Sequence, residues 1–156
     1  MPAGAGNAAA ATMTRTGRHG WARSIRALPF VVFASLCIWD AARAPLGRHP
    51  FELATDVSPA ALALALTKTK HMTVVALVFL LALLAVGLDR PWLAFVLTNA
   101  VGLTWELAQT TVVGHSARVA DLAPNVVVAG GGVAAVLAAR AVLRRARQPV
   151  RPDRRR

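Results

Sequence analysis

The sequence predicts an all-α integral membrane protein, a four-helix bundle with short loops and both termini in the cytoplasm. Hydrophobic residues make up 56% of its 156 residues and charged residues only 16%. A soluble domain of this size needs more polar surface than that. The apolar residues gather in four segments with short polar connections between them, and the basic residues gather at the two ends and at one of these connections.

The apolar segments predict the domain organisation. A transmembrane domain is expected over residues 21–143, after a disordered N-terminal tail at 1–20 and before a basic cytoplasmic tail at 144–156. The tails have no apolar periodicity that could pack a core. The expected spans are residues 22–42, 70–88, 91–113 and 122–143.

The first span is the shortest, because its apolar core Ala27–Trp39 has 13 residues where a span usually takes about 20. A cleaved signal peptide is the alternative interpretation, since Ala42-Arg43-Ala44 has the small-residue pattern of a cleavage site. Trp39 and Asp40 favour a retained helix, because they are typical of an interfacial helix end.

A helix-start signal precedes the second span. Ser58 can cap a helix and Pro59 suits its first turn. The apolar run that follows ends at Leu66 and is either an interfacial helix or an early turn of the next span.

The distribution of charge predicts the orientation. With four spans, both tails and the turn at 89–90 share one side of the membrane, which then holds thirteen basic and two acidic residues. The other side holds five of each, so the whole net charge of +11 falls on one side. The positive-inside rule makes that side cytoplasmic. Topology, with attraction to anionic lipids, therefore explains the basic tail, and no nucleic-acid partner is expected.

Polar residues interrupt the third span. Asn99, Gly102, Glu106 and Gln109 step by three and four, so they share one stripe of the helix, and a polar stripe with a glycine faces other helices and not lipid. Glu106 lies about 10 Å below the outer end of its span.

The polar stripe, the start of the second span and the start of the fourth span meet at one level near the outer surface in this topology. We therefore expect a polar site there, although each group alone could serve only to hold the helices together. The convergent residues are Lys68, His71, Glu106, Gln109, His115, Arg118, Asp121 and Asn125.

Three short motifs among these residues resemble the VanZ-like family: Lys68-x-x-His71, Glu106-x-x-Gln109 and Asp121-x-x-x-Asn125. The resemblance covers about residues 25–140. The chain departs from the family pattern at Thr67, where the family often has Asp, and Gly130 falls slightly later than the family's Gly. Either His115 or Arg118 fills the family's basic position.

The resemblance implies a small bacterial membrane protein with several spans in the cytoplasmic (inner) membrane. It also implies an action on the cell envelope that affects susceptibility to glycopeptides of the teicoplanin type. The expected partners are membrane lipids and an envelope lipid or glycopeptide-related ligand.

Two other function classes stay open, a membrane enzyme acting on a lipid-linked or headgroup substrate and a structural helper subunit of a membrane complex. The candidates for acid/base work are Glu106, His71 and Asp121, and those for ligand binding are Lys68, Gln109, His115, Arg118 and Asn125. The spacing contains no metal-ligand motif, and no cofactor is expected. The sequence does not indicate an oligomeric state.

Overall fold

The computed structural model describes residues 25–147. The predicted N-terminal tail at 1–20 and residues 148–156 of the predicted basic tail at 144–156 lie outside this range. Within it the chain is helical, with two isolated β-bridges and no strand. The elements are the helix Ile25–Ala42, α2 (Pro59–Leu66), α3 (Thr69–Val86), α4 (Pro91–Gln109), the 3-10 helix η1 (Val119–Leu122) and α5 (Ala123–Ala146).

Three segments of the described chain are long and apolar enough to cross a membrane: Ile25–Ala42, Thr69–Val86 and Val119–Ala146. Most of their residues are not buried, since 28% or less of the most apolar window of each segment lies inside the structure, and large apolar side chains such as Leu36, Leu80 and Leu137 are exposed. Apolar surface on this scale marks contact with a membrane or a partner, and the chain is therefore a membrane protein. The 19-residue α4 is comparable in length but carries more polar side chains.

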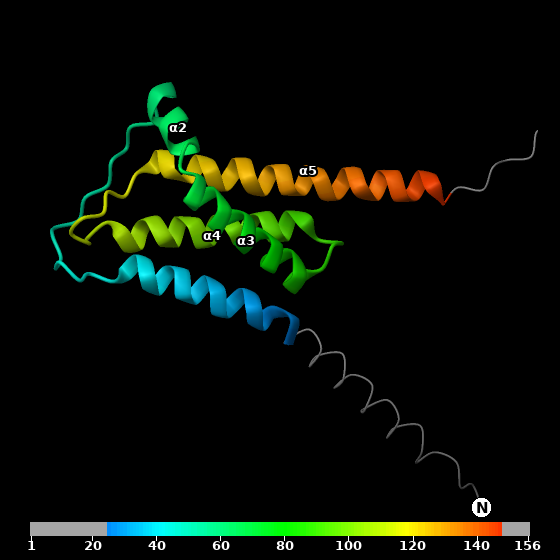
Figure 1. Cartoon of the computed structure of the whole chain (residues 1–156), viewed down its shortest axis with the longest axis horizontal. Coiled ribbons are helices and arrows are strands. Elements are labelled where there is room, and N and C mark those ends of the chain that lie inside the picture. Colours follow the sequence, from blue (N-terminus) through cyan, green and yellow to red (C-terminus); the bar gives the residue numbers. More distant parts are fainter. Residues whose placement is uncertain (1–24, 148–156) are drawn as a thin grey trace, which may run out of the picture.

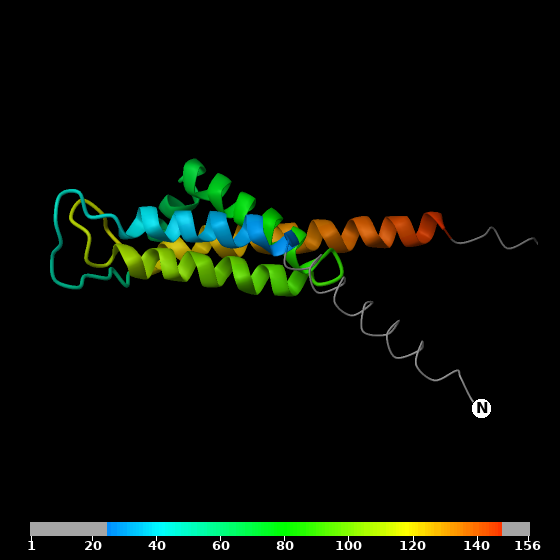
Figure 2. The ribbon, with the colours of Figure 1, turned by 90° about the horizontal axis from the view of Figure 1, so that it is seen from below.

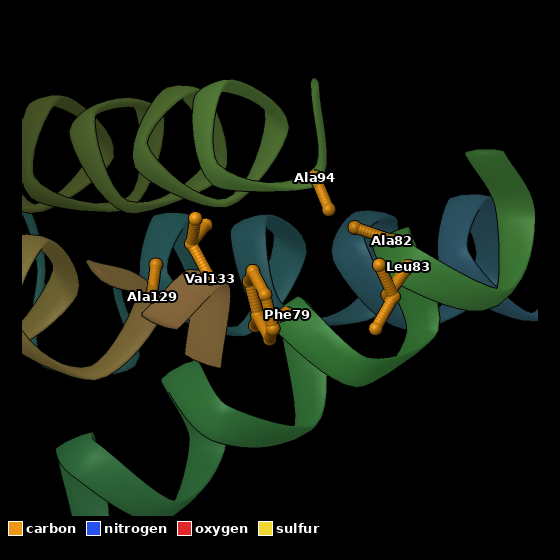
Figure 3. Packing of buried hydrophobic residues seen from close by; sticks show 6 residues of the cluster. All are labelled: Phe79, Ala82, Leu83, Ala94, Ala129 and Val133. Carbon is orange, nitrogen blue, oxygen red and sulfur yellow. The ribbon is translucent and has the colours of Figure 1, made fainter. Parts of the chain in front are cut away.

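The core of the bundle is built from side chains of α3, α4 and α5, which pack against one another, and three of its six residues are alanines. Figure 3 shows Ala82 and Ala94 beside the larger Phe79, and Ala129 with Val133 beside them. Small side chains let helix backbones approach closely. The helix Ile25–Ala42 joins this core through Phe30 and has a buried face of its own, formed by Ala34, Cys37 and Ala41.

Of the three consecutive glycines Gly130, Gly131 and Gly132 in α5, only Gly132 is needed for close packing. A Cβ atom on Gly132 would lie 2.4 Å from the Phe79 ring. A Cβ on Gly130 would make only van der Waals contact with Phe95, and one on Gly131 would meet open space.

Two long loops lie side by side at one end of the bundle (Figures 1 and 2). The segment 43–57 runs along the segment 110–119, and backbone hydrogen bonds join them. Examples are His49 N–H to the Thr111 carbonyl at 3.0 Å and Glu52 N–H to the Thr110 carbonyl at 2.8 Å. At the opposite end lie the start of the described chain, the α3–α4 turn and the end of α5 (Figure 1). There Arg140 of α5 forms an ion pair with Asp89 of the turn.

The helix-start prediction at Ser58 is confirmed, because the Ser58 hydroxyl accepts the N–H of Ala61 and Pro59 begins α2. The run up to Leu66 was expected to be either an interfacial helix or an early turn of the next span. The structure shows a helix, α2, that is separate from α3. It ends at Leu66, and the hydroxyl of the capping residue Thr67 donates to the Leu64 carbonyl.

Two predicted boundaries differ from the structure by three residues or more, and α3 ends at Val86, two residues before its predicted end. α4 ends at Gln109 instead of residue 113, because the following residues pair with the segment 43–57 and Gly114 has a φ of +87°. α5 continues to Ala146, so residues 144–146 of the predicted tail are helical. Arg144 and Arg145 lie in its last turn, where a positive charge complements the helix dipole.

We expect Gly132→Ala to lower the free energy of unfolding by about 1–3 kcal/mol, because the added methyl group overpacks the contact with Phe79. Gly131→Ala is the matched control and should be neutral or slightly stabilising. Thermal unfolding of the detergent-solubilised variants measures both. Equal melting temperatures for the two variants would show that Gly132 does not determine this packing.

Candidate functional site

A polar cavity of about 430 Å³ lies at the loop-bearing end of the bundle. Lys68 and the start of α3 form one wall, and the last turns of α4 form another. The loop after α4 and Asp121 of η1 complete the lining. The lining residues are Lys68, Lys70, His71, Val74, Trp105, Glu106, Gln109, Gly114, His115, Ser116 and Asp121.

An ion pair joins the start of α3 to η1. Lys68 Nζ lies 2.7 Å from Asp121 Oδ1 and 2.6 Å from Oδ2. The Asp121 side chain is only 6% exposed, whereas that of Lys68 is 41% exposed. The two charges therefore neutralise each other at the edge of the cavity. Asp121 is therefore the partner of Lys68 and joins η1 to the start of α3. This is the structural role that the sequence left open for each polar residue of the site.

A second polar contact lies one helical turn deeper. His71 Nε2 lies 3.1 Å from Asn125 Oδ1. Lys68 and His71 are three apart on one element, and Asp121 and Asn125 are four apart on the other, so the two contacts form consecutive rungs between α3 and the η1–α5 segment.

Gly102 makes room for the deeper rung. Asn125 is fully buried, and a Cβ atom on Gly102 would lie 1.9 Å from Asn125 Nδ2. Among the buried side-chain nitrogen and oxygen atoms of residues 25–147, this Nδ2 is the one that lacks a hydrogen-bond partner. Asn125 and Gly102 also line a small apolar cavity of about 10 Å³ beneath the polar one, a volume close to that of a single water site.

Glu106 is 4% exposed and lies on the wall contributed by α4. Its Oε2 accepts the backbone N–H of Arg118 at 3.3 Å. Within residues 25–147, Glu106 forms no ion pair with Lys68, His71 or Arg118. Trp105 precedes it, and the Trp105 ring lies 6.0 Å from the ring of His71.

The side chain of Arg118 does not line the cavity. Instead Arg118 contributes to the low pKa of Asp56 on the neighbouring loop. The pKa of that carboxyl group is held below its usual range first by the backbone N–H of Ser58, then by the Ser58 hydroxyl, with a smaller effect of the Arg118 charge.

The structure thus brings six of the eight predicted residues to one cavity: Lys68, His71, Glu106, Gln109, His115 and Asp121. Asn125 lies directly beneath it, and Arg118 contributes its backbone. Of the two residues that could fill the basic position, His115 lines the cavity. Asn99 of the polar stripe is half-buried and donates to the Phe95 carbonyl of its own helix, away from the cavity.

Several lining residues were not predicted, chiefly Lys70 and Trp105. Lys70 is adjacent to His71, and Trp105 is adjacent to Glu106. This adjacency could have predicted them, because the terminal turn of a helix presents neighbouring side chains to the same opening. No group of three His, Cys, Asp or Glu side chains in the described range could hold a metal ion. The cavity offers both charges, hydrogen-bonding groups and an aromatic face, which suits a small polar ligand or headgroup.

Comparisons with models of protein families, with curated proteins and with solved structures gave no match for this chain.

The coupling between Lys68 and Asp121 can be measured with a double-mutant cycle. We expect Lys68→Met and Asp121→Asn to show a coupling energy of about 1–2 kcal/mol in the free energy of unfolding, since the pair is half-exposed and not fully buried. Glu52→Gln, which removes an exposed carboxylate at the same end, is the control and should change stability by less than about 0.5 kcal/mol. Additive effects of the two substitutions on the free energy of unfolding would contradict an interaction between Lys68 and Asp121.

Proposed function

We propose that this chain is a VanZ-like protein of the bacterial cytoplasmic membrane that crosses it four times and acts on the cell envelope through its polar cavity. In this proposal the cavity opens at the outer face. Its action lowers susceptibility to glycopeptides of the teicoplanin type.

One observation carries the proposal. Charged and amide side chains from α3, α4 and the η1 region, far apart in the sequence, line a single cavity at one end of the bundle. Burying carboxylates such as Glu106 and Asp121 in an apolar protein is costly. A ligand site explains why this cost falls at one level of the bundle.

The charge distribution supports the orientation. The end that carries the cavity is balanced in charge, whereas the opposite end carries Arg90, Arg140 and the arginines of the last turn of α5. The positive-inside rule puts this arginine-rich end in the cytoplasm.

The resemblance to the VanZ-like family gains a physical interpretation. Residues of the K-x-x-H motif contact residues of the D-x-x-x-N motif, through Lys68–Asp121 and His71–Asn125. Both residues of the E-x-x-Q motif, Glu106 and Gln109, line the cavity. The three motifs therefore belong to one structural unit.

A membrane enzyme is the second candidate. Glu106 and His71 line the same cavity and are groups capable of proton transfer. Turnover of an envelope lipid by the purified protein would favour this candidate. Absence of turnover across the envelope lipids would leave the binding function.

The topology can be tested with single cysteines in a Cys37→Ala background. Leu46→Cys, in the loop at the cavity end, should react with a membrane-impermeant maleimide on intact cells. Arg90→Cys, in the α3–α4 turn, should react only after permeabilisation. The reverse pattern would overturn the proposed orientation.

Glu106→Gln tests the carboxylate in the cavity. In a teicoplanin-sensitive bacterium that expresses the chain, we expect this variant to abolish the protection that the wild type confers, because the amide carries no charge. It should still reach the membrane at the wild-type level, since the amide oxygen can accept the Arg118 N–H. The minimal inhibitory concentration and the amount of membrane-bound protein are measured together.

Glu52→Gln is the matched control and should retain full protection. Full protection by Glu106→Gln would show that the carboxylate is not needed. A wild type without any protective effect would contradict the glycopeptide part of the proposal.

A further inference from the structure

The polar cavity separates its charges by depth. Lys68 and Asp121 neutralise each other, with both carboxylate oxygens of Asp121 within 2.7 Å of Lys68 Nζ. The remaining charged residues of the lining are Glu106, which is 4% exposed, and Lys70, which is exposed at the rim. A carboxyl group thus lies buried in the lining, and an ammonium group lies exposed at its edge.

We propose that this cavity binds a zwitterionic phosphoethanolamine group, with its ammonium against Glu106 and its phosphate at the rim. This inference rests on the proposed function, because it names the ligand of the same cavity. A ligand with opposite charges at its two ends matches the arrangement of the lining, whereas a purely anionic ligand would place negative charge against Glu106.

The wall formed by α4 suits the ammonium end. Glu106 accepts one hydrogen bond, from Arg118 N–H. Because a carboxylate can accept several, it can also accept hydrogen bonds from an ammonium group. Gln109, one turn further along α4, also lines the cavity and supplies an amide oxygen. Trp105 lies on the same wall, where its ring can attract a cation.

The mouth of the cavity suits the phosphate end. Lys70, His115 and Ser116 are all exposed members of the lining. An ammonium, an imidazole and a hydroxyl group can each donate a hydrogen bond to phosphate oxygens. The volume of about 430 Å³ is within the range of small-molecule sites.

The position in the bundle fits a lipid as the source of this group. The cavity lies at the ends of helices α3 and α4, which is the level of the headgroups if these helices cross a bilayer. A headgroup can then enter the cavity while its acyl chains stay among the exposed apolar side chains of the bundle, such as Leu64 and Leu66 of α2.

Lipid binding to the full-length chain tests the inference. Native mass spectrometry of the detergent-solubilised protein would be titrated with phosphatidylethanolamine, phosphatidylcholine and phosphatidylglycerol carrying the same acyl chains. We expect phosphatidylethanolamine to bind on the order of tenfold more tightly than the other two, because only its primary ammonium is both positively charged and able to donate hydrogen bonds to Glu106.

Two variants separate the ends of the ligand. Glu106→Gln should remove the preference for phosphatidylethanolamine and leave phosphatidylglycerol binding unchanged. Lys70→Gln should weaken all three lipids by similar factors, because it acts on the phosphate that they share. Glu52→Gln and Arg144→Gln are the matched controls and should alter none of these affinities, and thermal unfolding checks that each variant is folded.

Soluble O-phosphoethanolamine distinguishes the two sources of the group. Competition by this compound would show that the free headgroup suffices, and phosphatidylethanolamine binding without competition would assign the lipid form. Equal binding of the three lipids by the wild type, or an intact preference in Glu106→Gln, would overturn the inference. If Glu106→Gln nevertheless lost glycopeptide protection, the proposed function would stand with a different ligand.

Discussion

The polar ladder between α3 and the η1–α5 segment is the constraint on which the candidate site depends. Lys68 contacts Asp121 and His71 contacts Asn125, so the start of one helix is held against the start of another. Apolar packing alone determines helix register weakly among small residues, whereas buried polar groups require particular partners. Gly102 completes the ladder, because any larger residue there would displace the Asn125 amide.

The loop after α4 completes the cavity that the helices begin, since Gly114, His115 and Ser116 belong to the lining. Backbone hydrogen bonds between the segments 43–57 and 110–119 hold the chain that closes the cavity. The same chain presents Arg118 N–H to Glu106. Helices thus supply most of the lining side chains, and hydrogen bonds between two connections without regular secondary structure hold the loop that completes the lining.

Local sequence signals predicted the positions of the helices well, but they did not predict which polar side chains contact each other. Apolar runs located α3 and α5, and Ser58 with Pro59 located the start of α2. The spacing of polar residues also indicated that they converge. It could not distinguish Asp121 from Glu106 as the partner of Lys68, because both carboxylates are expected at the same level. The early end of α4 was not predicted either, since it depends on contacts with a loop more than fifty residues away.

The length of α5 has a consequence for depth in a bilayer. Its 24 residues extend about 36 Å, more than the hydrocarbon thickness of about 30 Å, and Figure 1 shows it continuing past the ends of α3 and α4. The last turn carries Arg144 and Arg145, and Arg140 lies one turn earlier, paired with Asp89. In the proposed orientation these arginines lie in the inner headgroup layer. Because they fix one end of α5 there, the length of α5 determines how far the cavity lies below the outer surface of the membrane.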